Sequence, residues 1–387
     1  MTLLRRRLLD TPHSGIRRML ELAREVPDPL LLVSGDPNFR TPEHIIAGAA
    51  EAALGGATGY APAVGIAPLR AAIAKKLAQV NRIEADADQI CVVTGACGGL
   101  YTTLLLLVGP GDDVLIPNPG WSNYAAMVHV LGGRAVGYPV GPSTGWKLDP
   151  EAVEAAVSAQ TRAIILNSPG NPAGVVWTPE SLQAVVALAA RRGIPVISDE
   201  AYDELVFEGE PFSVGSVAPS PELISVFTFS KTYAMTGWRI GYVHSDADFA
   251  RQLSLHQEPV TSGASMVSQH AALAALEGPQ LAVSEMVSAY GQRRDQVIDL
   301  LRASDVGFVR PHGAFYLMVD IRATGCGSWE FATELLRGRG VGVVPGLAFG
   351  SEGEGYVRVS LAVAPEVLRE GVTRLLDLHR ELASRNG

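Results

Sequence analysis

The chain has 387 residues, of which 47% are hydrophobic and 18% charged, so it can bury a sizeable core and does not have the composition of a disordered chain. A net charge of −9 offers no general basic surface for nucleic acid, and three cysteines without a CxxC pair argue against a disulfide framework. The most apolar stretch, residues 100–108, is shorter than the roughly 20 residues that span a bilayer, so we expect a cytoplasmic protein without a membrane or nucleic-acid partner.

The middle of the chain alternates short apolar runs with helical patterns. These patterns predict a helix that begins near Pro68, strands at residues 89–94, 113–116, 162–166, 195–198, 223–229 and 239–244, a helix that ends at Leu107, and helices over residues 121–131 and 178–192. Continuous β-branched runs separated by helices favour a mostly parallel sheet that helices cover on both faces. The sequence therefore predicts an α/β fold.

The C-terminal part has a different pattern. It predicts a long helix over residues 279–303, two strand-like halves within 307–320, a helix over 329–337, strands at 341–344 and 356–361, and a final helix after Pro365. Strands and helices mixed in this way indicate a smaller α+β region attached to the α/β one.

Polar residues follow five of the predicted strands. The clusters are Gly95-Ala96-Cys97, Asn118-Pro119, residues 167–171, residues 199–202 and Ser230-Lys231. Each cluster alone is compatible with turn chemistry. Because open α/β sheets bind ligands beyond the carboxyl ends of their strands, the clusters together predict one crevice that collects them.

Only four lysines can supply a primary amine: Lys75, Lys76, Lys147 and Lys231. We expect Lys75 and Lys76 on the solvent face of a helix and Lys147 in a loop. Lys231 follows an apolar strand directly, and a partly desolvated amine there would have a lowered pKa and could attack an aldehyde. A surface lysine after a strand is the alternative.

The surroundings of Lys231 suit a phosphate dianion. Thr228 and Ser230 supply hydroxyl donors at alternate positions, and Arg239 supplies a guanidinium group. The glycine-rich turn at residues 95–99 leads into a helix whose N-terminus could add backbone N–H groups, although it could also be a tight turn only. Cys97 is expected to contribute its backbone N–H rather than a nucleophilic thiol.

Two further clusters and one rejected motif complete the pattern. Asp199, at the end of a strand, could pair with a cationic heterocyclic nitrogen; a solvated turn or a metal site are the alternatives, and a metal is disfavoured because no histidine pair has ligand spacing. Asn171, in a turn-rich loop, could donate its amide to a ligand oxygen. Residues 141–145 fit GxSxG, but no helix follows, so we predict a surface loop rather than a nucleophile elbow.

Nine segments, taken in this order, resemble the fold-type I pyridoxal-phosphate enzymes, specifically the class I/II aminotransferases. The segments are SGDPNFRTPEHI (residues 34–45), GYAPAVGIAPLR (59–70), TGACGGL, PNPGWSNY, NSPGNPAG, SDEAYDEL, SKTYAMTGWRIGY, VVPGLAFG and GYVRVSLA. The resemblance covers essentially the whole chain. It implies a large cofactor-binding domain over residues 46–284, with a mostly parallel central sheet, and a smaller α+β domain formed by residues 1–45 and 285–387.

The resemblance also implies a cofactor, pyridoxal 5′-phosphate, and its catalytic residues. Lys231 resembles the Schiff-base lysine, Asp199 the partner of the pyridinium nitrogen, and Tyr202 and Asn171 the donors to the phenolate oxygen. Trp121 would stack on the ring. The phosphate would contact the backbone of Ala96 and Cys97 and the side chains of Thr228, Ser230 and Arg239, with Tyr60 reaching it from a second subunit.

For the substrate, the resemblance implies that Arg358 binds the α-carboxylate and that Gly35 adds a backbone contact. The expected activity is transfer of an amino group between an amino acid and a 2-keto acid, by ping-pong kinetics through an internal aldimine at Lys231, in a homodimer with shared active sites. Three departures, Cys97, Thr228 and Ala173 in NPAG, leave these functions possible.

Alternative functions remain open at this point. A β-lyase, a cyclopropane-forming synthase or an oxidase-like variant would use the same lysine, aspartate and arginine. A cofactor-binding regulator would need a DNA-binding domain, for which the residues before Ser34 are too few. The amino donor, the keto-acid acceptor and the place in primary or specialised metabolism are not indicated by the sequence.

Overall fold

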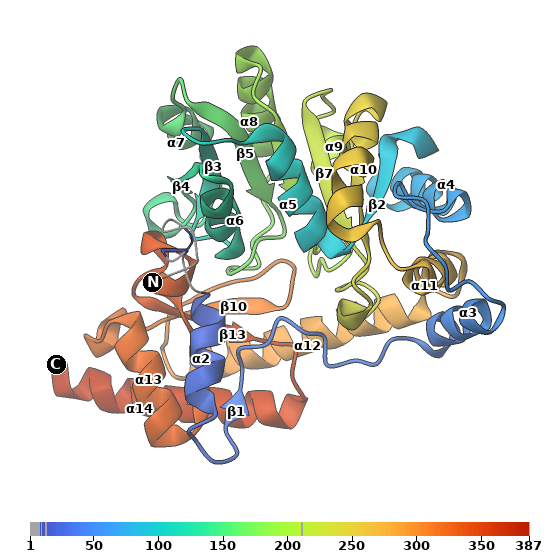
Figure 1. Ribbon diagram of the computed structural model, residues 1–387. Coiled ribbons are helices and arrows are strands. Elements are labelled where there is room, and N and C mark those ends of the chain that lie inside the picture. Colours follow the sequence, from blue (N-terminus) through green and yellow to red (C-terminus); the bar gives the residue numbers. More distant parts are fainter. Residues whose placement is uncertain (1–7, 9, 12–13, 210–211, 387) are drawn as a thin grey trace, which may run out of the picture.

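The apolar runs of the middle region pair into a seven-stranded sheet in the computed structural model, which describes residues 8, 10–11, 14–209 and 212–386 (Figure 1). The strands are β2 (Ile90–Val93), β3 (Asp113–Asn118), β4 (Arg134–Pro139), β5 (Thr161–Asn167), β6 (Val196–Asp199), β7 (Leu223–Thr228) and β8 (Gly241–His244), in the order β2-β8-β7-β6-β5-β3-β4. The strands from β4 across to β7 are parallel, and β8 is antiparallel to both of its neighbours. The expected mostly parallel sheet is confirmed.

Helices cover both faces of this sheet, because its central strands are apolar on both sides. Ile164 and Leu166 of β5 pack in one buried cluster with α7 (Pro150–Ala156), α8 (Pro179–Arg192) and α9 (Val214–Val217). Ile165, between them, packs in another cluster with α5 (Gly95–Leu107), α6 (Asn123–Leu131) and α10 (Ala247–Thr261). This alternation follows the two-residue period of a strand.

A third buried cluster lies at the β2 end of the sheet. It joins β2, β7 and β8 to α3 (Glu43–Leu54), α4 (Ala67–Lys76) and α11 (Met266–Glu277). A π-helical turn, η1 (Leu77–Asn81), continues α4, and a short 3-10 turn, η2 (Ala87–Gln89), precedes β2. The sequence pattern predicted α4 but not α3, α10 or α11.

The remaining elements form a second group below the large sheet in Figure 1. They are α2 (Gly15–Ala23), β1 (Leu30–Leu31), α12 (Leu281–Ala303), β9 (Phe308–Val309), β10 (Tyr316–Asp320), α13 (Ser328–Arg339), β11 (Val341–Gly342), β12 (Val344–Pro345), β13 (Tyr356–Ser360) and α14 (Pro365–Asn386). β12, β13, β10 and β9 form an antiparallel sheet, and β1 pairs with β11 in parallel. The predicted α+β character of this region is confirmed.

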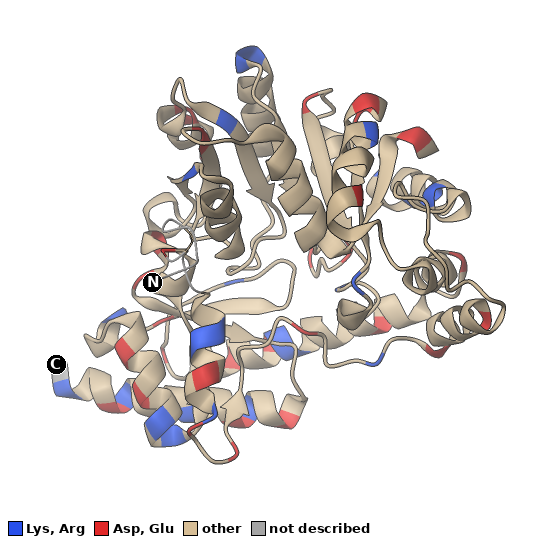
Figure 2. Cartoon of the chain, viewed as in Figure 1, with Lys and Arg blue, Asp and Glu red and all other residues tan. Residues whose placement is uncertain are grey.

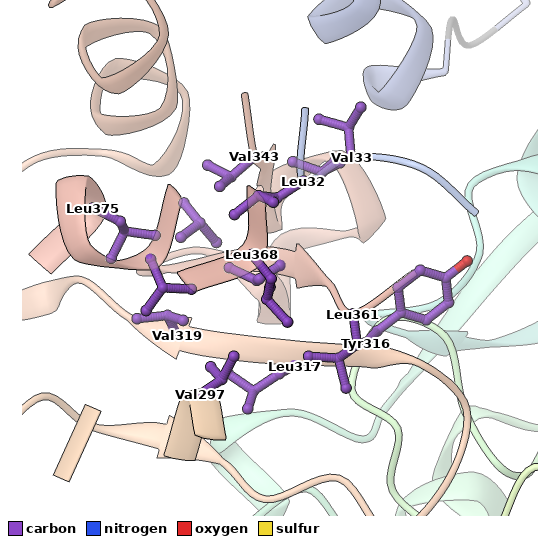
Figure 3. Close-up of a cluster of buried hydrophobic side chains, with 14 of the residues drawn as sticks. Leu32, Val33, Val297, Tyr316, Leu317, Val319, Val343, Leu361, Leu368 and Leu375 are labelled. Carbon is purple, nitrogen blue, oxygen red and sulfur yellow. The ribbon is translucent and has the colours of Figure 1, made fainter. Parts of the chain in front are cut away.

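One buried cluster holds the second group together and includes residues from both ends of the chain. Figure 3 shows Leu32 beside Val343, with Leu368 and Leu375 of α14 and Leu317 of β10 around them. The N-terminal segment therefore packs with the C-terminal elements rather than with the large sheet. Acidic and basic residues are interspersed along α13 and α14 (Figure 2), as is typical of helices with one solvated face.

The short turns also test two sequence interpretations. Residues 142–144 form a 3-10 turn, η3 (Pro142–Thr144), in which the Ser143 hydroxyl donates to Glu352 at 2.5 Å, so the prediction of a surface loop at the GxSxG pattern is confirmed. Lys75 is exposed as expected. The expectation of a solvent-exposed Lys76 is wrong, because its side chain is only 10% exposed and pairs with Asp203.

Among the helices that the structure describes, none combines the length and the apolarity needed to cross a membrane.

Candidate active site

The carboxyl ends of β5, β6 and β7 and the N-terminus of α5 open on one cavity of about 200 Å³. Most residues predicted for the site line it: Gly35, Ala96, Cys97, Trp121, Asn171, Asp199, Tyr202, Thr228, Ser230, Lys231 and Arg239. Segments that lie far apart in the sequence, from Gly35 to Tyr316, thus meet at one place. Four of the five predicted strand-end clusters contribute to the cavity, and Asn118-Pro119 does not.

Lys231 follows β7 and places its amine in this cavity. Its Nζ atom donates to the Gly35 carbonyl oxygen at 2.6 Å. Burial lowers the pKa of Lys231 to about 8, the positive charges of Arg239 and Arg358 act in the same direction, and Asp36 opposes them. A sizeable fraction of the amine is therefore neutral near physiological pH, which is the form that attacks a carbonyl group.

Asp199, the last residue of β6, is 4% exposed. Its carboxylate accepts hydrogen bonds from the Tyr124 hydroxyl at 2.5 Å and from the Ala201 N–H at 3.1 Å. Burial raises the pKa of Asp199 to about 6, although both hydrogen bonds and the charge of Lys231 favour the ionised form. A cation beside this carboxylate would relieve its burial cost, because opposite charges stabilise the ionised form.

Sequence patterns did not single out Tyr124, yet it lines the cavity and holds Asp199. It follows Trp121 by three residues, and their rings are in edge-to-face contact with centroids 5.3 Å apart. The predicted helix over residues 121–131 places residues three apart on one face, so this spacing could have indicated Tyr124, although Trp121 lies just before α6 in the structure.

An anion cradle lies between the α5 N-terminus and the turn after β7. The Thr228 hydroxyl donates to the Ser230 hydroxyl at 2.9 Å, and both line the cavity with Arg239. Gly95 has a φ of +74°, and a Cβ atom there would lie only 2.9 Å from an Arg239 guanidinium nitrogen. The positive φ favours glycine at this position, and the turn brings the helix N-terminus, two hydroxyls and a guanidinium group together.

Cys97 lies in the first turn of α5, within the cradle. Burial raises the pKa of its thiol, although the neighbouring Arg239 lowers it in part. A thiol with a raised pKa is a poor nucleophile. The environment of Cys97 therefore agrees with the expected role of its backbone rather than of its sulfur.

Arg358, in the middle of β13, is fully buried at the edge of the site. Its Nη1 atom donates to Asn171 Oδ1 at 2.9 Å and its Nη2 atom to the Val33 carbonyl oxygen at 2.8 Å. The guanidinium group lies 4.1 Å from the ring centroid of Tyr316 and 4.8 Å from that of Phe349. Among the residues that the structure describes, none accepts a hydrogen bond from its buried Nε atom, and a ligand carboxylate could satisfy this donor.

Tyr316 and Tyr202 both line the cavity, and the Tyr316 ring contacts the Arg358 guanidinium group. The Tyr202 hydroxyl donates to the Tyr316 hydroxyl at 3.2 Å. In Figure 3 the Tyr316 hydroxyl points out of the buried cluster that its ring joins. Burial raises the pKa of Tyr202 well above its usual value, so this hydroxyl stays protonated and can donate. Tyr316 was not predicted as a site residue.

Two predicted site residues, Arg358 and Tyr60, do not line the cavity. Arg358 contacts the lining residues Asn171 and Tyr316, whereas Tyr60 is directed to solvent. Its side chain is 92% exposed, and it follows Leu54, which is 90% exposed. The expected role of Tyr60 belongs to a second subunit, so its distance from the cavity of its own chain does not conflict with that role. Among the residues that the structure describes, no group of three or more His, Cys, Asp or Glu side chains could hold a metal ion.

The fold is that of the fold-type I transferases. The family model for aminotransferase class I and II matches residues 27–375, and the chain belongs to this family. Membership implies dependence on pyridoxal phosphate, and the protein is an aminotransferase. The lyase, synthase and oxidase alternatives are not favoured.

Individual aminotransferases are similar to this protein over nearly the whole chain. The aspartate/prephenate aminotransferase of Thermus thermophilus is 37% identical, over 92% of this chain and 92% of the relative. The arginine–pyruvate transaminase of Pseudomonas aeruginosa is 37% identical, over 89% of this chain and 88% of the relative. The structure of the Thermus thermophilus aspartate aminotransferase with maleate superposes with a TM-score of 0.92 at 35% identity, over 98% of this chain and 100% of that one.

Proposed function

We propose that the protein moves an amino group between an amino acid and a 2-keto acid with pyridoxal 5′-phosphate bound at Lys231. The observation that carries the proposal is the meeting, in one cavity, of a buried amine, a buried carboxylate and an anion cradle. Each group matches one part of the cofactor: Lys231 its aldehyde, Asp199 its ring nitrogen, and the cradle its phosphate.

The remaining cavity residues fit the same ligand. Trp121 would stack on the ring, while Tyr202 and Asn171 would donate hydrogen bonds to the phenolate oxygen. The phosphate would be held by the backbone of Ala96 and Cys97 and by Thr228, Ser230 and Arg239. When bound, the cofactor supplies an electron sink that stabilises negative charge at the substrate α-carbon.

The chain's own residues would orient the substrate and move its proton. Arg358 binds the α-carboxylate with the donor that is now without a partner, and Gly35 adds a backbone contact. The Lys231 Nζ atom would remove the α-proton as general base and, as general acid, would deliver it to the carbon of the cofactor's aldehyde group rather than back to the α-carbon, for which a pKa of about 8 is well suited. Two half-reactions with different substrates give ping-pong kinetics.

A test of the reaction type uses each half-reaction separately. The cofactor-loaded protein is mixed with aspartate, an aromatic amino acid or arginine, the donors suggested by the names of its relatives. Without an acceptor, we expect release of at most one keto acid per subunit, followed by arrest, and the addition of pyruvate or 2-oxoglutarate should restart turnover. Sustained release of product without an acceptor would contradict transamination.

The pKa of Asp199 predicts how stability depends on pH in the protein without cofactor. The pKa is raised from 3.8 to about 6 in the folded state. The contribution of Asp199 to the free energy of unfolding is therefore fully present below its unfolded pKa and is lost as the pH rises through 6, which amounts to about 3 kcal/mol. Asp199→Asn should lack this component. Glu200, whose pKa burial raises to about 8, contributes equally to both proteins, so it cancels in their difference.

Denaturant unfolding of both proteins between pH 4 and 7 measures this difference. With cofactor added, we expect the wild-type curve to flatten, because a cation beside Asp199 lowers its pKa. Identical pH dependence in wild type and Asp199→Asn would show that this carboxylate bears no burial cost.

We further propose a homodimer in which Tyr60 reaches the phosphate in the partner's cavity. This is supported by the exposed apolar side chains Leu54 and Tyr60, together with Val260, which is 61% exposed, since such groups favour an interface. The division into a large domain, residues 46–284, and a small one, residues 1–45 and 285–387, is supported by two buried clusters that contain only residues of the large domain. A third cluster is formed mostly by the small domain and includes Tyr202 and Leu205 of the large one. A cytoplasmic location stays a prediction.

A further inference from the structure

A second buried amine contacts the turn that follows Asp199 and contains Tyr202. Lys76, the last residue of α4, has a side chain that is 10% exposed, although lysine is rarely buried without a partner. Its Nζ atom donates to Asp203 Oδ2 and lies 3.3 Å from Glu204 Oε1. The Asp203 side chain is 3% exposed, so this ion pair is shielded from water.

The amine of Lys76 stays protonated. Burial by itself lowers the pKa of Lys76, but the charge of Asp203, with smaller contributions from Tyr242 and Glu204, outweighs it, so this pKa lies well above the usual value. Lys76 is therefore an ammonium group and not a nucleophile, in contrast to Lys231. Removing one partner of a buried pair leaves an uncompensated charge, which the surrounding chain must move to accommodate.

Asp203 belongs to the same turn as the two catalytic candidates. The Asp203 N–H donates to the Glu200 carbonyl oxygen at 3.2 Å, and the Leu205 N–H donates to that of Tyr202 at 2.9 Å. The chain between Asp199 and Leu205 is thus one compact unit. Asp203 lies on the side of this turn that faces Lys76. A displacement of Asp203 would therefore also displace Tyr202, the adjacent residue.

The same carboxylate is held by a second donor from the segment that follows Lys76. Asn81, at the end of the π-helical turn η1 and 2% exposed, donates its Nδ2 atom to Asp203 Oδ2 at 2.9 Å and to the Ser213 hydroxyl at 2.8 Å. Residues 76–81 therefore present two donors to one oxygen atom. Single π-turns within helices are often found at functional sites.

Lys76 also contacts the strand that leads to Lys231. Its Nζ atom lies 5.3 Å from the ring centroid of Phe227 in β7, a favourable cation–π geometry. Phe227 in turn stacks on Tyr242 of β8 with centroids 4.8 Å apart. One ammonium group thus lies between the strand that positions Lys231 and the turn that positions Asp199.

We propose that Lys76 is a positioning residue for the active site: with Asn81 it holds Asp203 and thereby fixes the turn that presents Asp199 and Tyr202 to the cavity. The proposal rests on the proposed function, because Asp199 and Tyr202 matter only if they contact the cofactor.

Lys75 offers a matched control, since the neighbouring lysine is exposed and can receive the same substitution. In Lys76→Met, amide hydrogen exchange of residues 199–205 in the full chain without cofactor should accelerate, and in Lys75→Met it should not. With cofactor, Lys76→Met should bind it more weakly, shift its visible absorbance and lower kcat, each effect on binding and kcat being roughly 10–100-fold. KM for the amino acid should change little, because Arg358 lies on another element.

A second set of variants separates positioning from stability. Asp203→Asn and the double variant Lys76→Met/Asp203→Asn should show the same defects in cofactor affinity and kcat as Lys76→Met. The midpoint of thermal unfolding should fall most in Lys76→Met, which leaves both Asp203 and Glu204 without their cation, and should recover in part in the double variant, which leaves only Glu204 without it. If Lys76→Met does not fold, the double variant carries the comparison with Lys75→Met.

The outcomes are distinct. Recovery of kcat and cofactor affinity in step with the unfolding midpoint would overturn the proposal, since Lys76 would then act on stability alone. Exchange, affinity and kcat equal to those of Lys75→Met would also overturn it and would leave the proposed function intact. Faster exchange with unchanged affinity and kcat would overturn both, because Asp199 and Tyr202 would then not act on the cofactor.

Discussion

Lys231→Ala should abolish aminotransferase turnover, with a loss of roughly 10⁴-fold or more, because the variant lacks both the amine that binds the cofactor and the group that moves the substrate proton. The visible absorbance that depends on the covalent link to Lys231 should vanish with the activity. Folding should be retained, since burial already opposes the charge of this lysine, as its pKa of about 8 indicates. Steady-state assays and absorbance spectra measure both effects.

Lys147→Ala is the matched control, because Lys147 is exposed in the loop that follows the 3-10 turn at residues 142–144. It should retain wild-type absorbance and turnover. If Lys231→Ala also retained both, the assignment of Lys231 as the cofactor lysine would be wrong.

Arg358→Ala should lower kcat/KM for the amino acid by roughly 10²–10³-fold, because a buried, charge-assisted contact to the substrate carboxylate is lost. Cofactor affinity should remain close to that of the wild type, since Arg358 is not among the residues that line the cofactor cavity. Stability should fall as well, because Asn171 Oδ1 and the Val33 carbonyl oxygen lose their buried donor.

Arg358→Lys distinguishes geometry from charge. Lysine keeps the positive charge but carries its donors on a single nitrogen atom, so it cannot reach Asn171 Oδ1, the Val33 carbonyl oxygen and the substrate carboxylate together as the planar guanidinium group does. We therefore expect most of the loss in kcat/KM to persist. Kinetics with several amino acids, together with cofactor titration, measure the two effects separately. An unchanged KM for amino acids in Arg358→Ala would count against a role in binding the carboxylate.

The large sheet was predictable because its strands are buried on both faces and read as continuous apolar runs. The edge strand β4 was not predicted, since only Tyr138 among its six residues is buried and its pattern lacks an apolar run. The helices α10 and α11 were not predicted either. α10 contains Pro259, which is unusual within a helix, and its polar and apolar residues offset each other in hydropathy. Local patterns thus find central elements better than peripheral ones.

The cavity was predictable for a different reason. The carboxyl ends of parallel strands lie at the same edge of a sheet, so residues that follow neighbouring strands, such as Asp199 and Lys231, lie near each other for any conformation of the loops. The positions of the strand ends do not predict which side chains of distant segments contact each other. Lys76 pairs with Asp203, 127 residues away, and the local sequence of its helix is equally compatible with exposure. Tyr316, the first residue of β10, likewise meets Tyr202 only because the smaller sheet packs against the turn that follows β6.

The central claim is that Lys231, alone among the four lysines, carries the cofactor. Borohydride reduction of the cofactor-loaded protein, followed by digestion and mass spectrometry, makes the attachment permanent and locates it. The structure predicts that the added mass of the reduced cofactor lies on the peptide containing Lys231, the amine that is buried in the cavity with a lowered pKa. The cofactor mass on a peptide containing Lys75, Lys76 or Lys147, or its absence from every lysine peptide, would contradict the account.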